Sequence, residues 1–288
     1  MSDIPEPVAR HIAEQGWGDV TGATPVGGGS ISDCHVLTTR AGPRLFLKLN
    51  GSAPADMFER EAEGLAALAT ASGAPRVPAP VLTGADFLLL EYIPSAPPAA
   101  DYWAAFGQRL ARLHSFTNAR FGFAHANYIG STTQPNPWTD DGYVFFAKQR
   151  LLFQAGLAHQ GGRLSAKWVR RIEVLADKLP TLIPFQAASL LHGDLWGGNA
   201  IPGPDGQACL IDPAAHFGWA EADLAMTTLF GRPPQSFYTA YAAERLPALE
   251  PGYAGRFDLY NLYHLLNHLN LFGASYLGSV EGILARYA

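Results

Sequence analysis

The sequence predicts an α+β fold in two lobes, with a small amino-terminal lobe built on an antiparallel sheet and a larger, mainly helical carboxy-terminal lobe. Short runs rich in β-branched and aliphatic residues fill much of the first 93 residues, whereas helical periodicity dominates after residue 100. A segment rich in proline and alanine, residues 94–100, separates the two halves. We therefore expect residues 1–93 and residues 94–288 to form the two lobes.

The amino-terminal half is expected to contain two helices and a sheet. Proline suits the first turn of a helix, and Val8 and Ile12 fall on one face, which predicts a helix over residues 5–15. Phe58 and Leu65 belong to an alanine-rich amphipathic pattern that predicts the second helix. This second helix covers residues 55–71, and the expected strands are residues 21–26, 31–39, 45–50, 81–82 and 87–93.

The carboxy-terminal half is expected to be mainly helical. Two strand-like runs, residues 188–191 and 207–211, interrupt the helices, and each leads into a cluster that contains Asp with His or Asn close by. A strand that delivers polar residues to its carboxyl end is a common way to build a site. The expected helices are residues 101–116, 138–156, 164–178, 221–230, 235–245 and 253–272.

Composition and charge exclude several classes of protein. The 288 residues carry 25 acidic and 20 basic side chains, a formal net charge of −5, which argues against a nucleic-acid-binding protein. Hydrophobic residues make up 48% of the chain and charged residues 16%, as in a globular protein with a large core. Two cysteines, Cys34 and Cys209, are too few for a disulfide framework and fit a reducing compartment. The first residues lack the apolar run of an export signal, so we expect a cytoplasmic protein.

The longest stretch without a formal charge, residues 259–280, is long enough to span a bilayer. Its side chains argue against a membrane, because Asn261, His264 and Asn270 would all need polar partners in lipid. We therefore expect a buried helix in the larger lobe and no membrane partner.

The most informative motif is H-x-D-x-x-x-x-N at residues 192–199, followed by an Asp at position 212. Phosphoryl transfer needs one carboxylate to orient a hydroxyl nucleophile, and a second carboxylate with an amide to hold Mg²⁺ on the phosphates. Asp194, Asp212 and Asn199 meet those needs, provided that a hairpin between residues 199 and 212 returns the second carboxylate. Taken alone, the motif could also be an ordinary turn with an Asx cap, since Gly, Asp and Asn are common in loops.

A lysine inside an apolar strand supports phosphoryl transfer. Lys48 follows Phe46 and Leu47, and a buried lysine needs an acidic partner. Glu61 on the following helix could supply it, with Glu59 and Glu63 as rivals. A strand lysine paired with a helix glutamate is the device with which protein kinases grip the α and β phosphates. Because glycine turn, Lys, Glu, linker, H-x-D-x-x-x-x-N and Asp follow one another in that order, the sequence predicts a protein-kinase-like fold.

A glycine-rich turn lies between two of the expected strands. Gly27, Gly28, Gly29 and Ser30 could cover phosphates with backbone N–H groups, as the glycine loop of a kinase does. The turn lacks the G-x-x-x-x-G-K-[ST] arrangement of a P-loop, and it opens into a strand rather than a helix, which argues against a dinucleotide-binding fold. A flexible hairpin turn is the alternative.

Nine segments spread over nearly the whole chain together carry a resemblance to a known family. They are GGGSIS (27–32), FLKLN (46–50), MFEREAEGLAAL (57–68), RVPAP (76–80), LLLEYI (88–93), HGDLWGGN (192–199), IDPA (211–214), EADLAMTTLFG (221–231) and LYNLYHLLNHLNLFG (259–273). Together they resemble the fructosamine-3-kinase (ketosamine kinase) family, relatives of aminoglycoside phosphotransferases and choline kinases. Members of that family phosphorylate the 3-hydroxyl of ketosamines, the sugar adducts of protein lysines or free amines. The adduct then falls apart and the amine is restored.

The resemblance implies a phosphotransferase with an alcohol acceptor that uses ATP and Mg²⁺ and acts on a small ketosamine or a glycated protein lysine. It also assigns roles residue by residue. These are Asp194 as proton acceptor, Asn199 and Asp212 as metal ligands, Lys48 with Glu61 as phosphate anchor, and Glu91, Tyr92 and Ile93 as the adenine-binding hinge.

One position departs from the family. Many members carry a cysteine where Ser30 stands, and that thiol can cross-link two chains under oxidation, so redox control through residue 30 is not expected here. Cys34 is close by on the next strand, where we expect a partly buried structural thiol.

Several aromatic and polar residues are candidates for the acceptor pocket. Trp196 and Trp219 could stack on a sugar or wall the pocket, although most tryptophans belong to the core. His264 and His268 have the i, i+4 spacing of metal ligands, but no third ligand is evident. The resemblance makes both histidines, with Asn267, a floor for the ketosamine; hydrogen-bonded buried polar groups are the alternative.

Two further residues are expected to support the motif. Asp223 could fix the catalytic loop by accepting backbone N–H bonds, or it could cap the helix that begins near Glu221. His192 is expected to brace the loop rather than move protons, because one carboxylate is enough for a loose phosphoryl transfer.

Two other functions compete with ketosamine phosphorylation. One is a kinase for another small hydroxyl acceptor, such as an aminoglycoside or choline, against which residues 259–273 argue. The other is a nucleotide-binding regulatory pseudokinase, against which the intact Lys48, Asp194, Asn199 and Asp212 argue.

Overall fold

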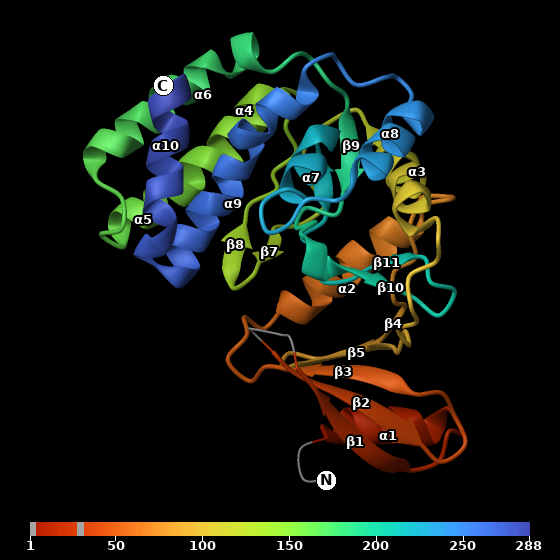
Figure 1. The fold of residues 1–288 in the computed structure, drawn as a ribbon. Helices are drawn as coiled ribbons and strands as arrows, with labels where there is room; N and C mark the ends of the chain where they lie inside the picture. Colours follow the sequence, from red (N-terminus) through yellow and green to blue (C-terminus); the bar gives the residue numbers. More distant parts are fainter. Residues whose placement is uncertain (1–3, 28–31) are drawn as a thin grey trace.

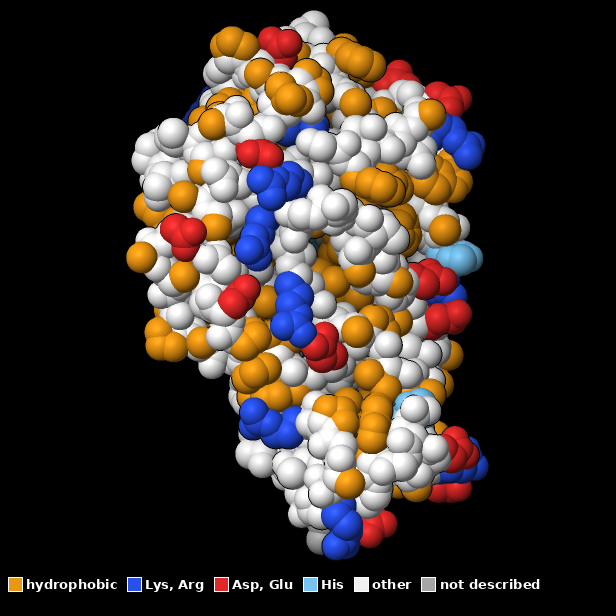
Figure 2. All heavy atoms as spheres, turned by 90° about the vertical axis from the view of Figure 1, so that its right-hand side faces the viewer, with side chains coloured by type: hydrophobic (Ala, Val, Ile, Leu, Met, Phe, Trp, Pro, Cys, Tyr) orange, Lys and Arg blue, Asp and Glu red, His pale blue; other side chains and the backbone are white. Residues whose placement is uncertain are grey.

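The computed structural model describes residues 4–27 and 32–288. It has the predicted α+β architecture, with an antiparallel sheet at one end of the molecule and a larger helical part at the other (Figure 1). The molecule tapers toward the end formed by the sheet, and basic, acidic and hydrophobic side chains are interspersed over the face drawn in Figure 2. The lobe boundary between residues 93 and 94 stays a prediction.

The sheet has five strands in the order β1-β2-β3-β5-β4, and all neighbours are antiparallel. The predicted strands and both predicted helices of this half are present. Their bounds are β1 Val20–Val26, β2 Asp33–Thr39, β3 Leu45–Leu49, β4 Pro80–Thr83, β5 Phe87–Glu91, α1 Glu6–Glu14 and α2 Met57–Ala69.

The two faces of strand β3 explain where its lysine points. Side chains alternate across a strand, so Leu45 and Leu47 share one face, where they pack in a buried cluster with Val8 and Ile12 of α1. Phe46 packs on the opposite face, in a cluster that includes Phe58 of α2. Lys48 shares that face and is therefore directed toward α2.

The larger part is mainly helical and contains one continuous core. Its helices are α3 Tyr102–His114, α4 Gly142–Phe146, α5 Phe153–Gln160, α6 Ala166–Leu182, α7 Ala220–Met226, α8 Gln235–Glu244, α9 Phe257–Phe272 and α10 Leu277–Tyr287. Its strands are β6 Thr117–Asn118, β7 Asn127–Ile129, β8 Thr132–Gln134, β9 Ala188–Leu191, β10 Ala200–Pro202, β11 Ala208–Leu210 and β12 His216–Gly218. They pair as β12-β9-β6, β10-β11 and β7-β8.

Some elements of this part differ from the prediction. The helix expected over residues 138–156 is instead α4, a π-helical segment Ala147–Leu152 and α5, and the first residues of the 253–272 helix form a separate 3₁₀ turn, Tyr253–Arg256. Strands of two or three residues, such as β6 and β7, are too short for an alternating pattern to reveal them. Helix α10 lies outside the predicted helices because glycines 278 and 282 lower its helix propensity.

Within residues 4–27 and 32–288, none of the helices has the length and apolar character needed to cross a membrane. Helix α9 is buried along most of its length, as predicted from the uncharged stretch that begins at residue 259. Helix α2 packs against β4 and β5 of the sheet and against β7 of the larger part, where the two parts join (Figure 1).

Candidate active site

A cavity of about 640 Å³ lies where the two parts of the molecule meet, and it gathers most of the predicted site residues. Its walls come from the sheet, from α2, from β7 and from the loops around β9 to β11. The predicted residues that line it are Gly27, Lys48, Glu61, Glu91, Tyr92, Ile93, Asp194, Trp196, Asn199 and Asp212. Gly28, Gly29 and Ser30 lie outside the described residues.

The buried ammonium of Lys48 joins two carboxylates from distant parts of the chain. Its Nζ donates to Oε1 of Glu61 and to Oδ1 of Asp212, each at 2.6 Å. Burial alone would lower the pKa of Lys48, but the two carboxylates outweigh it and raise the pKa above its ordinary value. Glu61 is confirmed as the lysine's partner, since Glu59 and Glu63 pair with Arg60 instead.

The loop after β9 presents Asp194 to the cavity. The side-chain amide of Asn199 donates to the backbone carbonyl of Asp194 at 2.8 Å and lies 3.3 Å from its Oδ2. Burial, followed by the negative charges of Asp212 and Asp223, raises the pKa of Asp194 to about 7. A carboxylate in this state is a better proton acceptor than an exposed one.

The predicted hairpin between Asn199 and Asp212 is confirmed. Strand β10 begins directly after Asn199 and pairs with β11 in the register Ala200 to Leu210. The backbone N–H of Ile211 then donates to the carbonyl of Asn199 at 3.1 Å. Asp212 has a positive φ of 56°, a conformation that few side chains adopt, so the turn after β11 holds this carboxylate in a strained position beside Lys48.

Asp223 of α7 holds the start of the catalytic loop, as predicted, rather than capping its own helix. Its Oδ2 accepts from the backbone N–H of His192 at 2.7 Å, and its Oδ1 accepts from that of Gly193 at 2.9 Å. The ring Nε2 of His114 lies 3.2 Å from Oδ2. Burial alone would raise the pKa of Asp223, but the bonds from His114 and the backbone lower it, so the carboxylate stays charged.

His192 braces the loop, also as predicted. Its Nε2 lies 2.9 Å from the carbonyl oxygen of Ile211, and its Nδ1 accepts from the backbone N–H of Asp194 at 3.3 Å. Burial lowers the pKa of His192, so the ring is neutral. Gly193 has a φ of 84°, and a Cβ there would lie 2.1 Å from the carbonyl oxygen of Ala214, so only glycine fits.

The three residues of the predicted hinge also line the cavity. Glu91 ends β5 and forms an ion pair with Arg76, and its backbone N–H donates to the carbonyl of Ala79 at 2.8 Å. The guanidinium of Arg44 lies 4.5 Å from the centre of the Tyr92 ring. The role of Glu91, Tyr92 and Ile93 as an adenine-binding hinge stays a prediction.

The prediction that Trp219 walls an acceptor pocket is wrong. Its side chain is 4% exposed and packs in the core, with ring centres of Phe121, Tyr143, Phe146 and Tyr260 between 5.2 and 6.1 Å away. Core packing prevails because Trp219 directly precedes α7, whose buried residues fix that segment in the interior.

The predicted polar floor on α9 is also wrong for His264 and Asn267. Both are buried, at 4% and 2% exposure, and neither is among the described residues that line the cavity. Asn267 accepts from Gln154 at 3.1 Å. His268 is less buried, and its Nδ1 lies 2.7 Å from the carbonyl of His264. No group of three His, Cys, Asp or Glu side chains among residues 4–27 and 32–288 could hold a metal, so the zinc interpretation gains no support.

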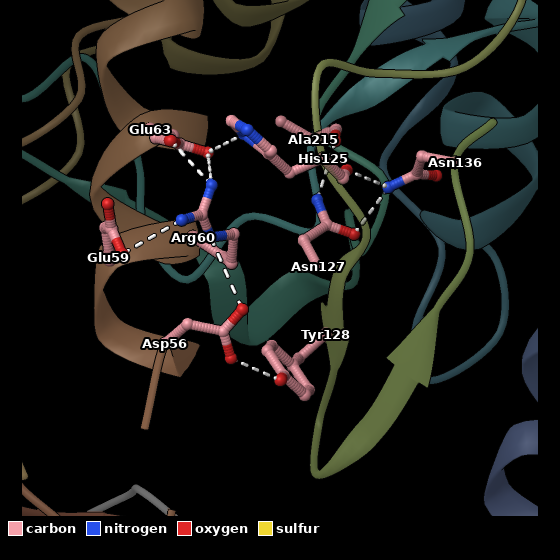
Figure 3. A network of polar contacts seen from close by, with 9 residues as sticks. All are labelled: Asp56, Glu59, Arg60, Glu63, His125, Asn127, Tyr128, Asn136 and Ala215. Atoms are coloured by element: carbon pink, nitrogen blue, oxygen red, sulfur yellow. Dashed lines mark hydrogen bonds and ion pairs between the residues drawn. The ribbon is translucent and has the colours of Figure 1, made fainter. Parts of the chain in front are cut away.

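Sequence reasoning missed the wall formed by α2 and β7 (Figure 3). Arg60 and Tyr128 line the cavity, and both belong to a polar network that joins the two elements. Arg60 pairs with Asp56, Glu59 and Glu63, and the hydroxyl of Tyr128 donates to Oδ1 of Asp56 at 2.6 Å. A strand of three residues carries no periodic signal, so nothing in the sequence indicated that Tyr128 would face α2.

Comparison with known proteins agrees with this geometry. The family model of fructosamine kinase matches residues 6–288. The chain belongs to the fructosamine kinase family. It is therefore a kinase, a phosphotransferase that acts on a hydroxyl group, and its fold is the two-lobed fold of protein-kinase-like phosphotransferases.

Three relatives illustrate the similarity. A Synechocystis protein named a probable ketoamine kinase is 41% identical over 90% of this chain and 88% of its own. A chloroplastic protein-ribulosamine 3-kinase of Oryza sativa subsp. indica is 37% identical over 98% of this chain and 83% of its own. A crystal structure described as a fructosamine-3-kinase from Thermobifida fusca has a TM-score of 0.88 and 31% identity, and covers 98% of both chains.

Proposed function

We propose that the protein transfers the γ-phosphoryl group of ATP to the 3-hydroxyl of a ketosamine, with Asp194 orienting that hydroxyl. The observation that carries the proposal is the bridge from Lys48 to Glu61 and Asp212, which stands in one cavity with Asp194 and Asn199. Phosphoryl transfer requires this arrangement: a cation for the phosphates, two oxygen ligands for the metal ion, and a carboxylate for the nucleophile. The names of the relatives, ketoamine kinase and ribulosamine 3-kinase, support the acceptor.

The residues present fit ATP and Mg²⁺. Asp212 and Asn199 offer the oxygen ligands that Mg²⁺ prefers. Two protein ligands are enough, because the nucleotide phosphates supply further oxygen ligands to Mg²⁺ in such sites. When bound, Mg²⁺ would neutralise charge on the phosphate oxygens. We assign Lys48 to the phosphates, Gly27 to Ser30 to a covering turn, and Glu91, Tyr92 and Ile93 to the adenine.

The chain's own contribution is positioning and charge. Asp194 accepts a hydrogen bond from the 3-hydroxyl and takes its proton as the bond from that oxygen to the γ-phosphorus forms and the bond from phosphorus to the β-phosphate oxygen breaks. Lys48 offsets negative charge on the phosphates. Asp223 and His192 keep the loop in place, so that Asp194 and Asn199 do not have to reorganise during the reaction.

The test is ATP consumption with Mg²⁺ against ribulose-lysine, fructose-lysine, a morpholine ketosamine, an aminoglycoside and choline. We expect turnover with the ketosamines, and the ratio of their kcat/KM values ranks the sugars. Turnover confined to the aminoglycoside or choline would replace the acceptor in this proposal. ATP binding measured by calorimetry without turnover on any of the five would favour a regulatory pseudokinase.

A further inference from the structure

A chain of five aromatic rings runs outward from the catalytic loop. The ring of Trp196 meets that of Phe230 at 6.1 Å between centres, and Phe230 meets His268 at 5.1 Å. His268 in turn meets Phe272 at 5.3 Å and Tyr276 at 5.1 Å. We call these five residues the aromatic shelf.

Three of the five rings of the aromatic shelf are exposed at the surface, and Tyr276 packs against the core beneath them. Trp196, Phe230 and Phe272 are 38%, 46% and 54% exposed. They come from the loop after β9, the segment after α7 and the end of α9, so the tertiary structure alone brings them together. Large exposed aromatic groups that form one patch usually mark a binding surface.

Position relates this surface to the reaction. Trp196 lines the catalytic cavity, and its backbone N–H donates to the carbonyl of Asp194 at 3.1 Å. The shelf thus begins two residues after Asp194, the residue to which we assign the acceptor hydroxyl. A molecule bound with a hydroxyl at Asp194 would extend its remainder onto the shelf.

The chemistry of the shelf favours a cation carried on an apolar chain. Burial lowers the pKa of His268, so this ring is neutral and adds no positive charge. Faces of tryptophan and phenylalanine attract ammonium groups and also pack against methylene groups. In a ketosamine, four covalent bonds, roughly 5 Å, separate the 3-oxygen from a secondary amine, which is protonated at neutral pH.

We propose that the aromatic shelf is the subsite for the amine portion of the acceptor, binding its protonated nitrogen at Trp196 and Phe230 and its alkyl chain along Phe230 and Phe272. The inference rests on the proposed function and deepens it. It assigns specificity to the amine part of the substrate: a ketosamine of lysine, with its long apolar stem, fits the shelf better than a ketosamine of a short polar amine.

The experiment compares two acceptors with one sugar, ribulose-lysine attached through the side-chain nitrogen and ribulose-ethanolamine. The variants are Phe272→Ala and Phe230→Leu, and Phe185→Ala is the matched control because Phe185 is 84% exposed outside the shelf. We expect Phe272→Ala to raise KM for ribulose-lysine about tenfold while KM for ribulose-ethanolamine and for ATP stays unchanged. Phe230→Leu, which keeps an apolar side chain but loses the π face, should raise KM for both acceptors.

The outcomes separate the two proposals. With the parent enzyme active, two results would overturn the shelf and leave the proposed function standing. One is that Phe272→Ala changes KM equally for both acceptors. The other is that neither Phe272→Ala nor Phe230→Leu changes KM for any acceptor. A parent enzyme inactive on every ketosamine would overturn both. Thermal melting of each variant controls for folding, and Phe185→Ala should match the parent in every constant.

Discussion

The two sides of Asp194 are built in opposite ways. Toward the sheet, Lys48 is 7% exposed and makes two hydrogen bonds of 2.6 Å to carboxylates. Toward α9, Trp196 and Phe230 are exposed and meet through ring faces and edges with centres 6.1 Å apart. Short charge-assisted bonds fix direction and distance, whereas ring contacts tolerate sliding.

This difference matches what we propose that each side binds. A phosphate chain has one shape and a high charge, and misplacing it lowers the rate steeply, so a rigid charged site suits it. The amine portion of an acceptor can vary without touching the reacting atoms, and a tolerant aromatic surface suits it. Substitutions on the charged side should therefore change the rate of phosphoryl transfer, and substitutions on the aromatic side should change which acceptor is preferred.

The largest effect is expected at the point where the two sides meet. Asp194→Asn should lower kcat about 10³-fold, because the acceptor hydroxyl loses its proton acceptor, while the dissociation constant of ATP measured by calorimetry stays close to that of the parent. Asp177→Asn on the exposed face of α6 is the control and should leave kcat unchanged. Turnover near the parent level in Asp194→Asn would remove this residue from the reaction.

The next effect concerns the rigidity of the loop. Gly193→Ala should lower the free energy of unfolding by about 3 kcal/mol, because the residue is held at positive φ and the new Cβ meets the Ala214 carbonyl. Gly197→Ala is a matched change at the aromatic end of the loop, where no atom of residues 4–27 and 32–288 would lie within 4 Å of the new Cβ, apart from its own neighbours in the chain. It should alter the free energy of unfolding by less than about 0.5 kcal/mol. Denaturant unfolding measures both, and equal losses would show that the loop is not held more tightly at the end near Asp223.

A smaller effect is expected from one buried carboxylate. Glu61→Gln should lower kcat/KM for ATP about 10- to 100-fold, because Lys48 loses one of its two charge-assisted hydrogen bonds. Glu63 on the same helix pairs with Arg60 and His125 instead. Glu63→Gln should therefore change kcat/KM for ATP less than threefold, since an exposed ion pair contributes about 0.5 kcal/mol. Equal losses in steady-state kinetics would contradict the assignment of Glu61.

The smallest effect is expected from a polar contact that is less buried than Glu61, and it tests whether polar contacts must be buried to affect kcat. Tyr128→Phe removes the hydrogen bond to Asp56 in the half-exposed network of Figure 3 and should lower the free energy of unfolding by about 1 kcal/mol, with kcat within about twofold. Tyr253→Phe, whose ring packs on Phe257, is the control. A loss of kcat as large as in Glu61→Gln would mean that this polar wall also belongs to the rigid side.

The charged side was largely predictable from the sequence. Lys48 in an apolar strand, Glu61 on the apolar face of the next helix, and Asp194, Asn199 and Asp212 in one spaced motif each carried a local signal. Asp223 could be placed as a support for the loop but not distinguished from a helix cap until its bonds to the backbone of residues 192 and 193 were located.

The acceptor side was predicted poorly. Trp219, His264 and Asn267 looked like pocket residues, yet all three are buried in the core, and the exposed Phe230 was not singled out. An aromatic or polar side chain on a helix can face the interior or the surface, and periodicity within a helix with a single charged residue, such as α9, does not distinguish the two.

The sequence by itself determined the fold class, the order of the catalytic groups and the phosphoryl chemistry, because each depends on residue types at short, fixed spacings within single strands, turns and helices. Only the tertiary structure decided which carboxylate meets Lys48, which side chains are buried, and that Trp196, Phe230 and Phe272 form one surface. Those contacts join residues far apart in the chain, and they depend on how helices and loops pack, for which a single sequence carries no local signal.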